Sequence, residues 1–516
     1  MCLSVLAAAS FVVVIEAQRS PAPDVISRIR AEADERSQIL RTVQVLTDLY
    51  GPRLTGSPNL EAAGEWALER MASWGLTNAH LESWDWERPG WANERVSAHI
   101  TSPVKDQLTV EVLAWSPGTD GPIRARAVHL NPPEEPTSEQ FTEYLDAIKE
   151  QVTDRIVLAG RHAEVPIDLT PPLTRLDEAQ VRADMAADGR NRSRRTQRRA
   201  NGVLSPAEMS RRIDQFLLAN GALLRIDDAG REHGQIAAFG NRTYDPARIV
   251  PTVVMRNEDY GRIARLLASD LSVELEFDIV NRMYPEGRTA YNVIAEIEGA
   301  DLRDEVVMIG GHLDSWQSAT GATDNAVGCA VMMEVARILR AIGARPRRTI
   351  RVALWSGEEQ GLRGSRAYVA EHFGSFEEQK QDFQHLVAYL NLDTGTGRPR
   401  GATVFGPQAA ADYLSELFTP FADLGMIGAV TTTRRTTYQT DHTVFNQAGL
   451  SGINFTQDPI EYDSHTHHTN LDSYERILEE DVKAAAVVIA STVYHLATRD
   501  DRLPRFSVDE MPRPAQ

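Results

Sequence analysis

Strand-like and helix-like segments alternate regularly from Thr289 to Ala497, and this pattern restricts the fold more than any other feature of the chain. Short apolar runs typical of buried strands are followed by longer amphipathic segments. The alternation predicts an α/β domain with a largely parallel sheet sandwiched by helices. The expected strands are residues 290–297, 305–309, 349–355, 386–392, 402–405 and 452–455, and the expected helices are residues 326–342, 362–372, 408–421 and 479–497.

Acids and an imidazole follow three of these expected strands. His312 follows residues 305–309, the pair Glu358 and Glu359 follows residues 349–355, and Asp393 follows residues 386–392. Asp324 comes just before an expected helix. Because sites in open α/β sheets form outside the carboxyl ends of the strands, we expect these side chains to converge at one sheet edge.

Neutral imidazole and carboxylate are ligands of zinc, and two zinc ions can share a bridging carboxylate. The spacing predicts one ion held by His312, Asp324 and Asp393. A second ion would be held by Asp324, Glu359 and His468. Glu358 then stays free to accept a proton from water and pass it to a leaving amine. Each residue alone is uninformative, but the set predicts a metal-assisted hydrolase, and an exopeptidase in particular.

Length, net charge and cysteine content limit the number of domains, the class of partner and the kind of metal site. A chain of 516 residues is long for one hydrophobic core, so more than one domain is expected. The formal net charge of −19 argues against nucleic acid as a partner, because phosphate would be repelled. Two cysteines, Cys2 and Cys329, exclude both a disulfide framework and a thiolate zinc site.

The N-terminus predicts export to the periplasm or the extracellular space. Residues 2–15 are almost wholly apolar, too short to span a bilayer but suited to the core of a signal peptide cleaved near Ala17. No Lys or Arg precedes this run, so a buried N-terminal strand is the alternative. No later stretch is long and apolar enough to predict a membrane span.

The rest of the chain predicts a catalytic domain in two parts with an insert between them. Residues 18–118, with helical patterns at 24–49 and 59–74, form the first part, and residues 283–500 form the second, followed by a tail at 501–516. The pattern of residues 119–282 predicts a self-contained α+β insert of short strands that is smaller than the catalytic domain. Six arginines lie between Arg190 and Arg199, and flanking acids favour a solvated segment over an anion-binding patch.

Six short motifs resemble the M28 family of zinc exopeptidases in order and spacing. The resemblance covers residues 24–118 and 289–497 and favours the carboxypeptidase Q branch. The insert resembles a protease-associated domain. The motifs are HLDS (312–315), GATDN (321–325), WSGEE (355–359), NLD (391–393), TDH (440–442) and HTNLD (468–472).

This resemblance implies the same ligand set, with Asp324 as the bridge and Glu358 as the general base. It further implies that Asp314 orients His312 or supports the metal. The Asp324–Asn325 peptide bond would be cis, as is common in the family. His468 fits the last ligand better than His467, which would then contact the reaction intermediate.

Tyr438, Asp441 and His442 are possible substrate contacts. Two other functions remain open: a zinc acyltransferase that cyclises N-terminal glutamine, and a receptor-like module without catalysis. A serine hydrolase is disfavoured, since no Gly-x-Ser-x-Gly motif occurs. The sequence leaves open which peptide terminus is recognised and which metal is native, and a homodimer is expected only by analogy.

Overall fold

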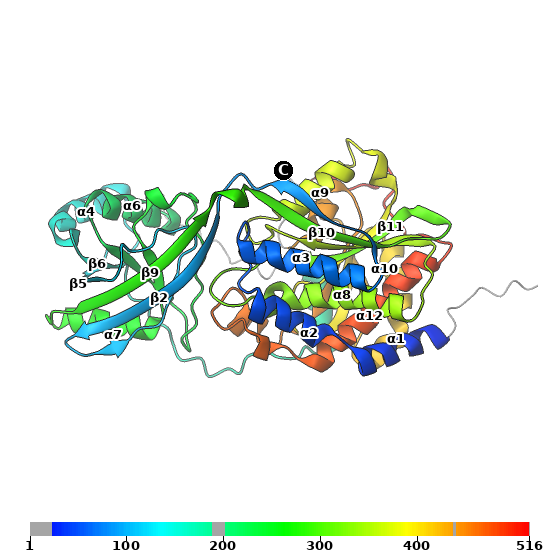
Figure 1. Cartoon of the computed structure of the whole chain (residues 1–516), viewed down its shortest axis with the longest axis horizontal. Coiled ribbons are helices and arrows are strands. Elements are labelled where there is room, and N and C mark those ends of the chain that lie inside the picture. Colours follow the sequence, from blue (N-terminus) through cyan, green and yellow to red (C-terminus); the bar gives the residue numbers. More distant parts are fainter. Residues whose placement is uncertain (1–22, 188–201, 437–439, 515–516) are drawn as a thin grey trace, which may run out of the picture.

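The computed structural model describes residues 23–187, 202–436 and 440–514. The predicted signal peptide, the arginine-rich segment 190–199 and Tyr438 lie outside these residues. Two sheets of eight strands each organise the described chain, and they lie side by side along the long axis of the molecule (Figure 1). None of the described helices is both long and apolar enough to cross a membrane.

The first sheet is mixed, with its central strands parallel. Its pairs β12–β11, β11–β13, β13–β16 and β14–β15 are parallel, and the remaining three pairs are antiparallel. This confirms the predicted largely parallel sheet. Its strands in spatial order are β1 (Thr77–Asp85), β10 (Thr289–Ile297), β12 (Arg348–Trp355), β11 (Leu302–His312), β13 (Leu386–Asn391), β16 (Gly452–Gln457), β14 (Pro399–Phe405) and β15 (Ala429–Thr432).

Helices cover both faces of this sheet, because its strands are apolar on both sides. On β11, Val307 and Ile309 belong to one core, whereas Val306 and Met308 belong to another. The first core includes residues from α1 (Pro23–Arg36), α2 (Ile39–Gln44), α3 (Pro58–Ser73), α8 (Val327–Ala341), α10 (Gln408–Phe418) and α12 (Glu479–Thr498), and the second includes residues from α9 (Arg363–His372) and α11 (His442–Ala448).

The second sheet builds the smaller part of the molecule. Long antiparallel strands β2 and β9 run from it toward the first sheet (Figure 1). Its strands in spatial order are β3 (Asp106–Gln107), β2 (Gly90–Ser102), β9 (Glu274–Tyr284), β5 (Ile123–Leu130), β6 (Ile156–Ala159), β7 (Leu224–Asp228), β8 (Thr252–Met255) and β4 (Val110–Val112). Its helices are α4 (Ser138–Val152), α6 (Pro206–Ala219) and α7 (Asn257–Ala268).

The insert predicted at residues 119–282 differs from the observed unit in two ways. Strands β2, β3 and β4 precede residue 119 but belong to the second sheet. Helix α5 (Glu178–Ala187), which lies within the predicted insert, packs against β14, β15 and β16 of the first sheet. Just before α5, Arg175 forms ion pairs with Asp458 and Asp481 of the catalytic part. The insert is therefore not self-contained.

Candidate metal centre and its cleft

The predicted site residues lie at the carboxyl ends of three neighbouring parallel strands. His312 is the last residue of β11, Glu358 and Glu359 follow β12, and Asp393 follows β13. Since β11 pairs in parallel with both β12 and β13, the three strand ends meet at one edge of the sheet. The structure thus brings these side chains together, as the strand pattern predicts.

His312 is buried, and its two ring nitrogens face different groups. Nδ1 lies 2.9 Å from the backbone carbonyl of Asp314, which fixes the proton on Nδ1. Nε2 lies 3.0 Å from Asp324 Oδ1 and 3.1 Å from Asp393 Oδ1. Nε2 is therefore directed at two carboxylates.

Asp324 lies between two imidazoles. Its Oδ1 faces His312, whereas its Oδ2 lies 3.1 Å from His468 Nε2. His468 Nε2 is also 2.9 Å from Glu359 Oε2. His467 is more distant, with Nε2 3.9 Å from Asp324 Oδ2. One carboxylate thus connects a cluster around His312 with a second cluster around His468.

The backbone around Asp324 is fixed by side chains from elsewhere in the chain. Asp472 accepts hydrogen bonds from Thr323 N at 2.6 Å and from Asp324 N at 3.1 Å. Asn325 donates from Nδ2 to the carbonyl of Leu392 at 2.9 Å. The Asp324–Asn325 peptide bond is cis, as the family resemblance implies.

The carboxylate of Asp314 supports the paired glutamates, whereas its backbone carbonyl contacts the imidazole of His312. Its Oδ1 lies 3.7 Å from His312 Nδ1, too far for a hydrogen bond, so the carbonyl of Asp314 orients that ring. The carboxylate accepts from the backbone N–H of Glu358 and of Glu359, each at 3.2 Å, and from the Thr55 hydroxyl at 3.1 Å. The predicted positioning role of Asp314 therefore acts on the loop after β12.

Arg53 is a positioning residue that sequence reasoning did not single out. Its guanidinium is fully buried and donates to the carbonyls of Leu313, Leu46, Thr320 and Gly321 at 2.7–2.8 Å. These bonds join the loop after His312 to the loop before Asp324. The turn-rich segment 50–57 was visible in the sequence, but nothing in it indicates which carbonyls Arg53 reaches.

Burial and crowding shift the ionisation of the carboxylates. Burial raises the pKa of Glu358 well above its usual value; His312 opposes this shift, and Asp393 adds to it. Burial raises the pKa of Glu359 to about 7. Burial acts in the same direction on Asp324, but hydrogen bonds from His312 and His468 outweigh it and hold the pKa of Asp324 well below its usual value. The cluster concentrates negative charge that a cation would stabilise.

The donor set fits divalent zinc. Among the described residues, Glu359 Oε1 is buried and accepts no hydrogen bond, although a buried anionic oxygen is costly without a partner. Ligand atoms of His312, Asp324 and Glu359 lie within 4.8 Å of one another, as do those of Asp324, His467 and His468. Imidazole nitrogen and carboxylate oxygen are the ligands that zinc accepts.

Comparison with known proteins agrees with this chemistry. Residues 292–493 match the model of peptidase family M28. These residues therefore form an M28 peptidase domain. Carboxypeptidase Q of Homo sapiens is 26% identical to this M28 peptidase over 478 residues, which cover 89% of this chain and 85% of that protein. Leucine aminopeptidase 2 of Trichophyton equinum is 34% identical over 192 residues, 35% of this chain and 36% of that protein.

Two solved structures share the fold of this M28 peptidase. A peptidase M28 precursor from Shewanella amazonensis has a TM-score of 0.64 and 22% identity, and the match covers 94% of this chain and 98% of that one. A zinc aminopeptidase from Bacillus subtilis has a TM-score of 0.55 and 18% identity, covering 92% and 98%. The expected hydrolase class and the expected α/β fold are confirmed.

The candidate metal centre opens into a cleft of about 420 Å³, which is large enough for a short peptide. Thr440 lines this cleft, but Asp441 and His442 are 0% and 2% exposed, so these two predicted substrate contacts lie beneath its wall. The cleft is lined by Asp324, Glu358, Glu359, Gly361, Leu362, Arg366, Asp393, Thr394, Thr440, Asn454, Tyr462, His467 and His468.

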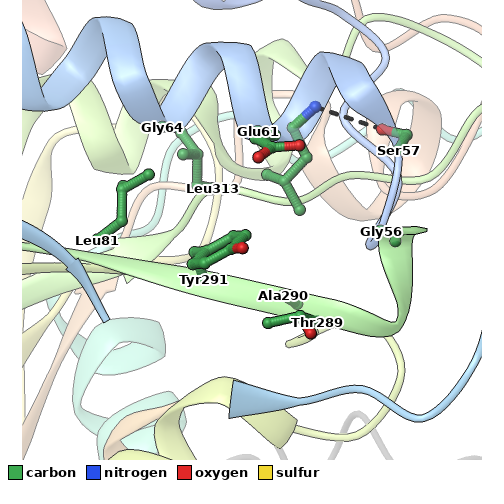
Figure 2. A pocket seen from close by; sticks show the side chains of 11 residues that line it. Gly56, Ser57, Glu61, Gly64, Leu81, Thr289, Ala290, Tyr291 and Leu313 are labelled. Carbon is green, nitrogen blue, oxygen red and sulfur yellow. Dashed lines mark hydrogen bonds between the residues drawn. The ribbon is translucent and has the colours of Figure 1, made fainter. Parts of the chain in front are cut away.

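A second, much smaller pocket lies between α3 and β10 (Figure 2). Leu313, Leu81 and Tyr291 line it, and Glu61 is its only acidic residue. The Ser57 hydroxyl caps α3 beside it by accepting from Leu60 N. Since this pocket holds no imidazole and one carboxylate, it lacks the donor set of the metal centre.

Two further residues of the M28 peptidase escaped the sequence reasoning. Arg366, in the first turns of α9, lines the cleft. Phe239, from the segment between β7 and β8 of the second sheet, packs against His468. No spacing rule connects Phe239 with a histidine more than 200 residues later, so only the fold reveals the contact. Arg366 follows the WSGEE motif closely, but an arginine on an amphipathic helix is usually a solvated side chain.

Proposed function

We propose that the chain is a zinc-dependent exopeptidase that hydrolyses the terminal peptide bond of short peptides. The observation that carries this proposal is the position of Asp324, which presents one oxygen to His312 and the other to His468. Such a carboxylate is suited to bridge two zinc ions. His312 and Asp393 would complete the ligands of one ion.

Glu359 and His468 would complete the ligands of the second ion, giving two zinc ions per chain. When bound, zinc supplies Lewis acidity toward the scissile carbonyl and toward water. His467 is the less favourable ligand, since it lies farther from Asp324. Burial, with His468 adding to it, lowers the pKa of His467 to about 4, so this ring is neutral at pH 7 and offers a hydrogen bond to substrate.

Glu358 is the proposed general base. It lines the cleft in the same cluster as the proposed ligands, and its buried carboxylate binds a proton readily because its pKa is raised. The backbone N–H of Glu358 donates to Asp314, which fixes the loop that carries this side chain into the cleft lining. The carboxylate would take a proton from the attacking water and return it to the nitrogen of the leaving amine.

A peptide-library digest tests this function. Purified protein loaded with zinc should shorten short peptides by terminal residues, as read by mass spectrometry, and removal of zinc by a chelator should stop the reaction. A glutaminyl peptide included in the library distinguishes the acyltransferase alternative, because cyclisation lowers the peptide mass without releasing a residue. Cleavage only at internal bonds, or no cleavage, would contradict the proposal.

We also propose export, from the apolar run at residues 2–15. Mass determination of the mature protein in its host should then place the N-terminus near residue 18, whereas an intact N-terminus would contradict export. The homodimer expected by analogy stays a prediction. Light scattering of the purified chain measures it directly.

A further inference from the structure

We propose that Arg366 binds the free α-carboxylate of the substrate, so that the enzyme acts on dipeptides and on the carboxyl ends of short peptides. This inference rests on the proposed exopeptidase function and adds which peptide terminus the cleft recognises. Its basis is the contrast between Arg366 and the other charged groups that line the same cleft.

Arg366 is the one residue with a guanidinium or ammonium group among the described residues lining the cleft. The acids there are Asp324, Glu358, Glu359 and Asp393, and each belongs to the proposed metal and base cluster. No described carboxylate in the lining is therefore left to pair with the α-ammonium group of a substrate. A substrate carboxylate, in contrast, can pair with the guanidinium of Arg366.

The contacts of Arg366 leave its charge available. Its Nε donates to the carbonyl of Gly361 at 3.1 Å, and one terminal nitrogen donates to Gln447 Oε1 at 3.3 Å. Both acceptors are uncharged. No ion pair to Arg366 occurs within the described part of the chain, although the buried carboxyl of Asp441 lies near enough to act on its charge. Arginine stays protonated at neutral pH and binds carboxylate through parallel N–H donors.

The position of Arg366 relative to Glu358 is fixed by the backbone. The N–H groups of Gly361 and Leu362 both donate to the carbonyl of Glu358 at 2.8 Å, and Gly361 in turn accepts from Arg366. The proposed base and the proposed carboxylate ligand therefore lie at the two ends of one short, hydrogen-bonded loop. Such coupling sets a constant distance between the scissile bond and the terminal carboxylate.

Another arginine on the same helix provides a control. Arg363 lies one turn before Arg366, but its guanidinium stacks on the ring of Trp86 at 5.3 Å from the centroid and does not line the cleft. The two residues are alike in type and in place along α9. If positive charge near the cleft were enough to favour substrates with a free carboxylate, both arginines would contribute to that preference. Direct binding of the carboxylate is expected of Arg366 only, because Arg363 does not line the cleft.

The test compares alanyl-leucine, alanyl-leucinamide and alanyl-aspartic acid α-amide, whose only carboxylate is on its side chain. Zinc-loaded wild-type protein should cleave the free acid with a kcat/KM at least about tenfold above that of either amide. In Arg366→Gln, the KM for the free acid should rise about 10- to 100-fold with little change in kcat, while the amides are unaffected. Arg363→Gln should keep the preference for the free acid.

Gln447→Ala removes a contact of Arg366 without removing the charge, so it should also keep the preference. Equal cleavage of the free acid and the leucinamide by wild-type protein would overturn the role of Arg366 while leaving the exopeptidase function intact. This comparison uses the wild-type protein alone, so it does not depend on whether a variant folds. Efficient cleavage of the aspartic acid α-amide would show that a side-chain carboxylate is recognised, which overturns it as well. Absence of cleavage of all three substrates, together with no terminal trimming of a peptide library, would instead refute the proposed function.

Discussion

The ring of Phe239 lies edge-on against the imidazole of His468, with ring centroids 5.5 Å apart. Phe239 belongs to the segment between β7 and β8 of the second sheet, whereas His468 follows β16 of the first sheet. Phe239 also meets Trp316 edge-on at 5.2 Å. The smaller part of the molecule thus touches a proposed zinc ligand directly and limits the orientations of its ring.

We expect Phe239→Ala to weaken zinc binding about 2- to 10-fold, because an aromatic pair of this kind contributes ~0.5–1.5 kcal/mol. The side chain is 42% exposed, so the thermal stability of the fold should change little. Competition with a chelator measures the zinc affinity. Leu271→Ala, which removes an apolar side chain of 45% exposure elsewhere in the second part, is the control. Unchanged zinc affinity in Phe239→Ala would mean that the contact does not orient His468.

The arrangement of the catalytic sheet could be predicted because its signals are local. Each strand is a short apolar run, each covering helix has its own periodicity, and the site residues follow strand ends in sequence. His312 is an example: its place at the end of β11 follows from the run before it and from the parallel topology. Helix α4 was missed even though Thr137 and Gln140 form a capping box, a signal that the sequence does contain.

The features that escaped prediction depend on distant pairing. Strand β2 pairs with β9, which lies about 180 residues later, and the sequence of β2 does not indicate which strand it will join. The same holds for α5, whose burial depends on β14 and β15, far along the chain. The boundary of the insert was therefore misplaced, and the role of Arg53 was hidden until the four carbonyls around it were known.

Replacing Glu358 with Gln should lower kcat about 10²- to 10⁴-fold, the usual contribution of a general base, while zinc content stays unchanged. The amide keeps the shape of the side chain but cannot accept the proton. Steady-state kinetics and metal analysis on the same sample measure both. Glu61→Gln, in the pocket beside α3, changes an acid outside the cluster and should keep full activity. A Glu358→Gln variant with near-normal turnover would exclude Glu358 as the base.

Replacing Asp324 with Ala should lower the zinc content at both proposed positions, because each oxygen of this carboxylate faces a different imidazole. Asp393→Ala is the matched comparison, since Asp393 contacts His312 alone among the proposed ligands, and it should affect mainly one ion. Metal analysis after gel filtration gives the number of zinc ions per chain. Two ions retained in Asp324→Ala would show that this carboxylate does not bridge them.

Asp314→Ala should lower both kcat and thermal stability, since it removes the acceptor of the N–H groups of Glu358 and Glu359 and of the Thr55 hydroxyl. A buried donor left without a partner costs ~1–3 kcal/mol. Thermal unfolding and kinetics give the two readouts. Thr55→Ala removes only one of the three donors and leaves the glutamate loop in place, so its effect on kcat should be small. Equal effects of the two variants would argue against the positioning role of Asp314.

Glu111, on β4 of the second sheet, provides a pH test that is independent of zinc. Burial raises the pKa of this carboxyl to about 8. An acid whose pKa is higher in the folded than in the unfolded protein contributes most to the free energy of unfolding below its unfolded pKa, where it is protonated in both states. This contribution is lost as the pH rises through the folded pKa. The free energy of unfolding should therefore fall between pH ~4.5 and about 8 relative to Glu111→Gln, which does not titrate there. At pH 8.5 the variant should be the more stable protein by roughly 3–5 kcal/mol, whereas at pH 5 the two should nearly coincide. Thermal unfolding at both pH values measures the difference, and a constant difference between them would show that Glu111 does not ionise in this range.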